Sequence, residues 1–305
     1  MKCTLLLAVL ASAAACSVEE APQAPHADTF ESLGLDLEDP EDRQTAFLKT
    51  RGSLDPEEET FFYWTGSIFV QQDADPFGSA MNDFPGPVLH FDGFNVARFG
   101  EDGGDIRMIT REVAVYRDLD GEIIDCWWNA PTGASPSSQV RVAHVWNDPV
   151  NFTIPVPEHD VVDGRVVWRT EVMLNYTNPL PVDDYPDYSA GNTYQSAEMF
   201  NWFVDFEDLD DASIDSAPVH ISWSRVGQFV PWMQAGQTPG RLIYHTHGRK
   251  LLGGFSELPQ DLQEFVLERD PSFQNAPEAD VSPNMTSWRV FKQAVDSGSY
   301  TPTCD

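Results

Sequence analysis

The chain has 305 residues, of which 41% are hydrophobic and 12% aromatic, which is enough apolar material for a substantial core. Its 49 acidic residues against 18 basic residues give a formal net charge of −31 at pH 7. This charge repels phosphate backbones and anionic lipid head groups, so it argues against nucleic acid as a partner. The simplest interpretation is an acidic, well-solvated surface.

The first fifteen residues have the pattern of an export signal peptide. Lys2 precedes the apolar run TLLLAVLASAAA, which is too short to cross a bilayer. The run ends directly before Cys16, in the manner of a bacterial lipobox, in which the cysteine becomes lipidated. We therefore expect an exported protein in the periplasm or at the outer membrane, held to the membrane only by a lipid anchor at Cys16. Ordinary cleavage after an Ala-x-Ala triplet, giving a secreted protein, is the alternative.

Residues 16–38 are rich in proline, alanine and glutamate, which predicts a disordered tether. A single folded domain is then expected over residues 39–305, because no second linker follows. Its first helix begins at Pro40, with Asp39 as the N-cap, and ends near Gly52.

Most of the remaining chain has the pattern of short antiparallel strands. Strands are predicted at 61–70, 105–118, 123–129, 139–146, 165–176, 219–226 and 241–247, with a hairpin turn at Asp120-Gly121. Helices are predicted at 197–209, 259–270 and 282–295. This pattern favours a mainly β, single-domain antiparallel β-barrel, lipocalin-like, with a few peripheral helices and an internal ligand site.

The cysteines indicate one disulfide. Cys3 leaves with the signal peptide and Cys16 is used if it is lipidated, which leaves Cys126 and Cys304. An even pair in an oxidising compartment is expected to form a bridge. Two free thiols are the alternative.

Seven segments together resemble the family called domain of unknown function 1838, over roughly residues 39–293. They are LKTRGSLD (48–55), FDGFNVARFG (91–100), VWNDPVNF (145–152), AEMFNWF (197–203), SWSRVGQFVPWMQAG (222–236), YHTHGRKLLGGFSELP (244–259) and SPNMTSW (282–288). The resemblance implies an export signal, which members commonly carry. It brings no established reaction with it.

The chain carries no motif of a nucleophilic hydrolase, a P-loop, a dinucleotide-binding turn or a zinc protease. The turn GEDGG (100–104) is acidic and would repel phosphate. We therefore expect no nucleotide or nicotinamide cofactor, and no cofactor of another kind.

The stretch LIYHTHGRK (242–250) contains the strongest candidate residues. His245 and His247 alternate on a strand, so they share one face with the apolar Ile243, and we predict that this face lines the barrel interior. His245 is the predicted acid–base catalyst, with His144, Tyr116 and Glu198 as further candidates. The predicted substrate contacts are Arg111, Arg225, His247, Trp223, Asn147 and Trp288.

Two other interpretations of these residues stay open. A zinc site could use His245, His247 and either His144 or a carboxylate, but Arg249 and Lys250 follow where a metal-binding glutamate is expected. The polar residues could also pair with one another in a pocket that only binds. The predicted function is cofactor-independent acid–base catalysis, by a lyase, isomerase or hydrolase, on a small, largely apolar or aromatic molecule. The alternative is a non-catalytic binding lipoprotein.

Overall fold

The computed structural model describes residues 31–72, 86–102, 105–135, 137–278 and 284–304. The predicted signal peptide and Cys16 lie outside the described residues, as does most of the predicted tether. The last part of that tether is corrected by the structure. The Leu33 N–H donates to the carbonyl oxygen of Asp210, and Leu37 is buried in the core, so residues 31–38 belong to the folded domain.

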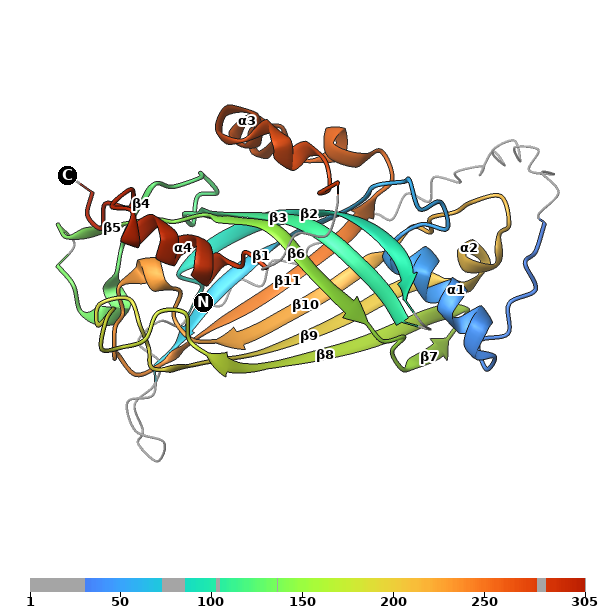
Figure 1. The fold of residues 1–305 in the computed structure, drawn as a ribbon, viewed down its shortest axis with the longest axis horizontal. Coiled ribbons are helices and arrows are strands. Elements are labelled where there is room, and N and C mark those ends of the chain that lie inside the picture. Colours follow the sequence, from blue (N-terminus) through green and yellow to red (C-terminus); the bar gives the residue numbers. More distant parts are fainter. Residues whose placement is uncertain (1–30, 73–85, 103–104, 136, 279–283, 305) are drawn as a thin grey trace, which may run out of the picture. The chain divides into compact units, whose positions relative to one another are not determined.

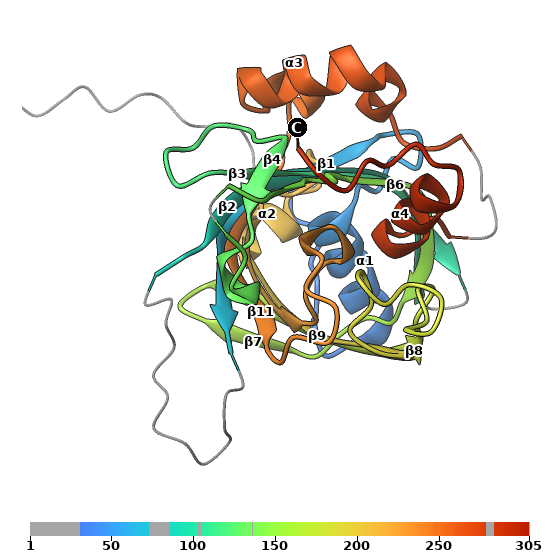
Figure 2. The same ribbon diagram turned by 90° about the vertical axis from the view of Figure 1, so that its left-hand side faces the viewer.

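One antiparallel sheet of nine strands forms the body of the domain (Figure 1), in the order β6-β3-β2-β1-β11-β10-β9-β8-β7. Its strands are β1 (Thr60–Gln71), β2 (Leu89–Asp102), β3 (Asp105–Arg117), β6 (Val145–Ile154), β7 (His159–Val162), β8 (Arg165–Thr177), β9 (Thr193–Asp205), β10 (His220–Gly227) and β11 (Arg241–Leu251). The mainly β, antiparallel fold is therefore confirmed. The sheet curls into a half-barrel with β6 and β7 as its edges, seen end-on in Figure 2.

The remaining elements are short. The helices are α1 (Pro40–Arg51), α2 (Phe206–Asp210), α3 (Gln260–Arg269) and α4 (Ser287–Asp296), with 3-10 turns η1 (Ala130–Thr132), η2 (Pro231–Met233), η3 (Gly254–Glu257) and η4 (Pro271–Gln274). A second sheet contains only β4 (Cys126–Trp128) and β5 (Gln139–Arg141). The Asp118 N–H donates to the Glu122 carbonyl, which makes the predicted turn, but β4 then leaves β3 and pairs with β5. In the described part of the chain, no helix is long and apolar enough to cross a membrane.

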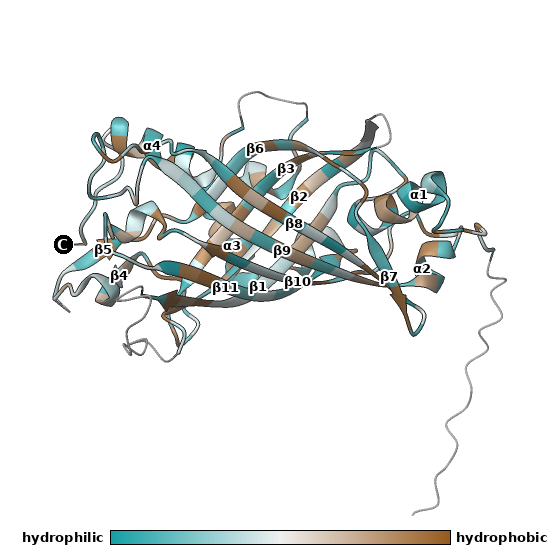
Figure 3. Cartoon of the chain, turned by 90° about the horizontal axis from the view of Figure 1, so that it is seen from below, coloured by the Kyte–Doolittle hydropathy of each residue, from teal (hydrophilic) through white to brown (hydrophobic). Residues whose placement is uncertain are grey.

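The helix predicted at residues 197–209 is wrong, because most of that segment forms strand β9. β9 pairs along its length with β8 on one side and β10 on the other. Its aromatic residues favour a strand, and its inward positions Trp202 and Val204 are buried. Figure 3 shows the alternating hydropathy along β8 and β9 that a half-buried strand requires. Helix α2 begins only after Asp205.

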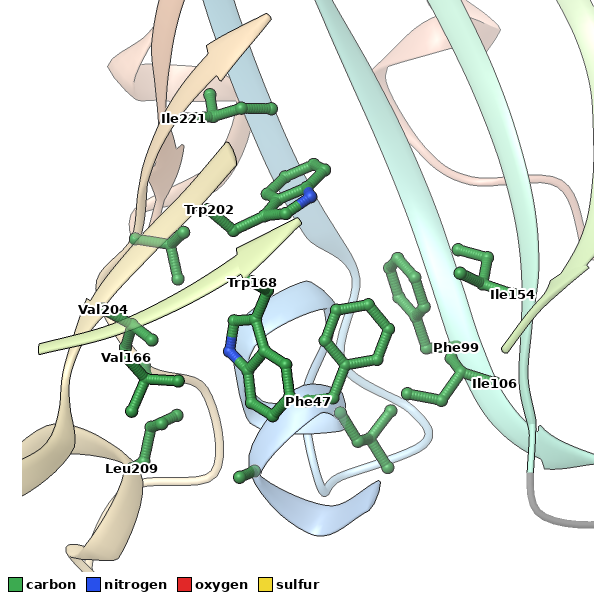
Figure 4. Packing of buried hydrophobic residues seen from close by; sticks show 14 of the residues in the cluster. Phe47, Phe99, Ile106, Ile154, Val166, Trp168, Trp202, Val204, Leu209 and Ile221 are labelled. Carbon is green, nitrogen blue, oxygen red and sulfur yellow. The ribbon is translucent and has the colours of Figure 1, made fainter. Parts of the chain in front are cut away.

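Helices fill the concave side of the sheet from its two ends. At one end Phe47 of α1 packs against Trp168 of β8, with ring centroids 5.2 Å apart, inside a cluster that also contains Phe99 and Trp202 (Figure 4). At the other end the second cluster contains Trp288 of α4 together with η2. The third cluster lies on the outer face, where α3 covers part of β2 and β3 (Figure 1).

Lys250 fastens α1 to the sheet. Its ammonium donates to the carbonyl oxygens of Lys49 and Gly52 at 2.7 and 2.9 Å and to Ser216 Oγ at 3.1 Å. These carbonyls lie at the C-terminal end of α1, where a helix leaves its own acceptors unpaired. Burial lowers the pKa of Lys250 well below its ordinary value. The side chain nevertheless has an acceptor for each of its three N–H groups.

We predict that Lys250→Met destabilises the protein by about 1–3 kcal/mol, because methionine keeps the apolar stem but leaves buried helix carbonyls without a donor. The control is Arg249→Met, which removes the same charge from the neighbouring exposed position on β11. Urea unfolding followed by tryptophan fluorescence measures both variants. Equal stabilities for the two variants would contradict the anchoring role.

The predicted disulfide between Cys126 and Cys304 is confirmed, with the two Cα atoms 6.1 Å apart. It joins β4 to the C-terminal segment, where Thr303 also bridges Val140. Since the bridge closes a loop spanning 178 residues, it constrains the unfolded chain strongly.

Cys304→Ser should therefore lower the free energy of unfolding, by at most about 5 kcal/mol in the chain-entropy model. Reduction of the wild-type protein should give the same loss, and reduction of the variant should change nothing. Urea unfolding with and without a reductant makes the comparison. A wild-type protein that is insensitive to the reductant while free thiols appear would refute the expectation.

Candidate functional site

The alternation along β11 places His245 and His247 on the outer face, where both are exposed. The prediction that they line the interior is wrong, and with it their roles as catalyst and substrate contact. Ile243, which guided that prediction, lies on the same outer face and is half-buried. Tyr244 and Leu242 are the buried, inward residues of this strand.

Arg111 and His144 also lie away from the concave face. Arg111 of β3 pairs with Asp148 at 3.0 Å and donates to the carbonyl oxygen of Ser272 at 2.7 Å on the outer side. The predicted substrate contact at Arg111 is therefore wrong. Side chains alternate between the two faces of β3, and the next residue, Glu112, points inward, so Arg111 points outward.

His144 is enclosed between β3 and α3. Its Nδ1 accepts the backbone N–H of Tyr116 at 3.1 Å, and its ring packs edge-on against Phe265. Burial lowers its pKa to about 4, so the imidazole stays neutral at pH 7 with its accepting nitrogen already in use. His144 thus lies apart from the concave face, and its catalytic role stays a prediction. Among the described residues no group of three or more His, Cys, Asp and Glu side chains could hold a metal ion.

The other predicted residues converge on the concave face. Strand register turns Tyr116 of β3, Glu198 of β9, and Trp223 and Arg225 of β10 to this side. Two residues that sequence reasoning did not select join them, namely Glu112 of β3 and Tyr244 of β11. We call these six residues the interior cluster: Glu112, Tyr116, Glu198, Trp223, Arg225 and Tyr244.

Arg225 is the positive centre of the interior cluster. Its guanidinium lies 5.1 Å from the ring centroid of Tyr244 and 5.8 Å from that of Trp288, so the predicted substrate contact Trp288 lies beside the interior cluster. Its Nη2 donates to the Tyr194 hydroxyl at 2.9 Å, and its Nε lies 3.5 Å from Oε1 of Glu198. Burial opposes the charge of Arg225, but the charge of Glu198 and the hydrogen bond to Tyr194 help to raise its pKa, so it stays charged.

Two buried carboxyl groups face each other across this space. Burial raises the pKa of Glu198, while the charge of Arg225 and the neighbouring Trp223 indole oppose the increase. Burial also raises the pKa of Glu112, and the charge of Glu198 adds to this increase. Asn147 partly opposes it, because its Nδ2 donates to Glu112 Oε2 at 2.7 Å, and the charge of Arg51 opposes it further. Because Arg225 lies beside Glu198, the arrangement favours the ionised form of Glu198 more than that of Glu112.

Asn147 thus forms a hydrogen bond with the carboxyl group of Glu112. Its own Oδ1 accepts from the Ser287 hydroxyl of α4 at 3.1 Å, so the amide is oriented with its nitrogen toward the carboxyl. The sequence prediction of Asn147 as a substrate contact stays a prediction. What the structure adds is its hydrogen bond to an inward carboxyl.

The two tyrosines of the interior cluster are neutral phenols. Burial raises the pKa values of Tyr116 and Tyr244, and their hydroxyls interact with each other. Tyr116 packs against Trp232 of η2, and Tyr244 against Phe91 of β2. They can donate hydrogen bonds but are poor bases at neutral pH.

Solvent reaches this face. The Glu198 side chain keeps 20% of its surface exposed, and the inward residues Trp64, Thr170 and Phe200 are only half-buried. A surface hollow at the β8 edge is lined in part by Thr170. Several buried polar atoms on the concave face lack a hydrogen-bond partner, among them Asn95 Oδ1, Thr170 Oγ1, Ser196 Oγ, Trp202 Nε1 and Trp223 Nε1. Unpaired buried polar atoms of this kind indicate bound water or a ligand.

We predict that Glu112→Gln is more stable than the wild-type protein near neutral pH, by about 1–2 kcal/mol, the cost of an unfavourably buried polar group. Glutamine keeps the oxygen that accepts from Asn147 but never ionises. Because the folded pKa of Glu112 lies above its unfolded value of 4.5, the folded state binds more protons between the two values. Wild-type stability therefore falls as pH rises through that interval, and the advantage of the variant should shrink again as pH returns toward 4.5.

Urea unfolding at a series of pH values measures this difference. Glu171→Gln is the control, since Glu171 is an exposed residue on β8. A Glu112→Gln variant that is destabilised equally at every pH would contradict the raised pKa.

A comparison with protein families assigns the chain to one of them. A family model described as a protein of unknown function (DUF1838) matches residues 57–295, which is most of the folded domain. A search of curated proteins gives no match. The chain therefore belongs to the DUF1838 family, as the seven segments of its sequence indicated.

Proposed function

We propose that the concave face binds a small, largely apolar or aromatic molecule and that Glu112 and Glu198 act on it by acid–base chemistry. The observation that carries this proposal is the pair of buried carboxyl groups with raised pKa values on one aromatic, solvent-reached face. Groups of this kind gather at catalytic sites, because proton transfer is efficient when the pKa lies near the working pH.

The two carboxyl groups differ in the roles they suit. Glu198 lies beside the charged Arg225, so it is the group able to accept a proton from the substrate. Glu112, whose pKa is raised by burial and by the charge of Glu198, is the group suited to return one. The phenols of Tyr116 and Tyr244 can donate to an oxygen on which negative charge develops. Lyase, isomerase and hydrolase reactions all use these elements.

Binding without turnover is the second candidate. The aromatic wall favours it, because Trp64 and Phe200 lie next to Trp223, with ring centroids 6.3 and 6.0 Å from that of Trp223. Such a wall accommodates an apolar ligand with or without chemistry.

We also propose that the protein works outside the cytoplasm, anchored by lipid at Cys16 in the periplasm or at the outer membrane. The signal pattern of the first fifteen residues supports export. The Cys126–Cys304 disulfide supports it independently, because such bridges persist in oxidising compartments. Intact mass of the exported protein tests the anchor, since a mature chain without added lipid mass would exclude it.

The catalytic proposal predicts that Glu198→Gln lowers kcat by about 100-fold or more, the range for loss of a general base. The wild-type protein would be incubated in D₂O with a panel of small aromatic ketones, enones and esters. NMR then detects solvent deuterium entering the substrate, or product. Glu171→Gln should keep full activity. Compounds that bind and quench tryptophan fluorescence, but show neither exchange nor turnover, would favour the binding function instead.

A further inference from the structure

Arg51, the last residue of α1, carries a buried guanidinium enclosed by aromatic rings. The residue is 7% exposed. Its Cζ lies 3.9 Å from the ring centroid of Trp202, 5.2 Å from that of Phe62 and 5.6 Å from that of Phe99. Stacking of this kind occupies the faces of the planar guanidinium. Its five N–H groups point outward in the plane and still need acceptors.

Those acceptors are largely missing from the described part of the protein. The hydrogen bond that the guanidinium makes is from Nη2 to the sulfur of Met108 at 3.6 Å, and a thioether is a weak acceptor. No described carboxylate forms an ion pair with Arg51, although Arg111, Arg117 and Arg225 each have one within 3.5 Å. A buried cation without a direct ion pair is costly, and burial accordingly lowers the pKa of Arg51 to about 9, although the charge of Glu112 opposes the decrease.

Arg51 belongs to the same space as the proposed acid. It packs on Phe62 of β1, which pairs with Asn95 of β2, which in turn pairs with Glu112 of β3. The charge of Glu112 is the one that supports the ionised form of Arg51. The Trp202 ring beneath the guanidinium has its own unpaired donor, Nε1. Figure 4 shows this nitrogen turned toward the interior.

We propose that Arg51 binds a carboxylate of the ligand, which makes the substrate class a small aromatic or apolar carboxylic acid. This inference rests on the proposed ligand site on the concave face. A carboxylate offers two oxygens in a plane, which match the fork of the guanidinium, and it supplies the missing charge. The apolar part of the molecule would then extend along Phe200 and Trp223 toward Glu198.

The test uses two pairs of probes that differ only in charge: benzoate with benzamide, and 2-naphthoate with 2-naphthamide. Binding to the folded wild-type protein is measured by tryptophan fluorescence and calorimetry at about 0.15 M salt, which screens the acidic surface. We expect each carboxylate to bind about tenfold more tightly than its amide, as a charge-assisted hydrogen bond gives. Equal binding would overturn the role of Arg51 and leave the site itself standing. Failure of all four probes to bind would overturn both.

The variant Arg51→Met identifies the residue. It should lose the preference for 2-naphthoate, keep its affinity for 2-naphthamide, and melt no lower than wild type, because it removes an unpaired buried charge. A structural arginine would show the opposite, a lower melting temperature with the preference retained, and that result would overturn the inference.

Two further variants complete the test. Arg249→Met removes the same charge from an exposed position and should keep the full preference. Arg51→Lys keeps the charge but loses the planar fork, and should weaken 2-naphthoate binding several-fold without changing 2-naphthamide binding. If Arg51→Met does not fold, the Arg51→Lys result decides, and an unchanged preference would count against the guanidinium.

Discussion

A curled sheet that does not close has to fill its concave side from its ends, and this constraint organises the whole domain. The buried aromatic residues at one end come together around Phe47 of α1, and those at the other end around Trp232 and Trp288. The half-buried Trp64 lies between the two sets and packs against both. Lys250 matters for this reason, because it holds the C-terminal end of α1, and therefore Arg51, in a fixed position against β11.

In the middle of the sheet, one tryptophan lies between glycines on the two neighbouring strands. Trp64 of β1 lies directly opposite Gly93 of β2 and Gly248 of β11. A Cβ added at Gly93 would lie 2.8 Å from Trp64 Nε1, so a larger residue there would displace the indole. Glycine within a strand often marks such a close approach or a bend. The indole therefore lies against Gly93, and it joins Trp223 in the aromatic wall.

The chain has a large net negative charge, whereas the concave face carries both positive and negative groups. The chain as a whole carries a formal charge of −31, yet the concave face places two arginines against two carboxyl groups. One arginine, Arg225, is matched by Glu198 and by the Tyr194 hydroxyl. The other, Arg51, has only aromatic faces and a thioether. Groups held in such unfavourable surroundings reduce stability, and proteins keep them chiefly where they serve function.

Local chemistry in the sequence determined several features of this protein. Asp39 accepts from the N–H groups of Glu41 and Asp42 and so starts α1 where the cap residues indicated. Counting cysteines selected the pair that forms the bridge, and the turn at Asp118–Glu122 follows from its Asp-Gly. The alternation along most strands predicted a mainly β domain, and the seven segments indicated its family. Each of these signals depends on neighbours in the chain or on composition.

Only the tertiary structure decided which side of each strand faces inward. The alternation in β11 is clear, but Ile243 on one face and Leu242 and Tyr244 on the other are all apolar. The pattern therefore predicts a strand but does not show which of its two faces is buried. The same ambiguity on β3 explains why the sequence indicated Arg111 as a contact, although Glu112 is the residue that faces inward. In β9 the aromatic run fits a helix or a strand, and pairing with β8 and β10 settled it. Arg51 reaches the site through the packing of α1 into the open end of the half-barrel, a contact between distant segments that no local pattern in the sequence specifies.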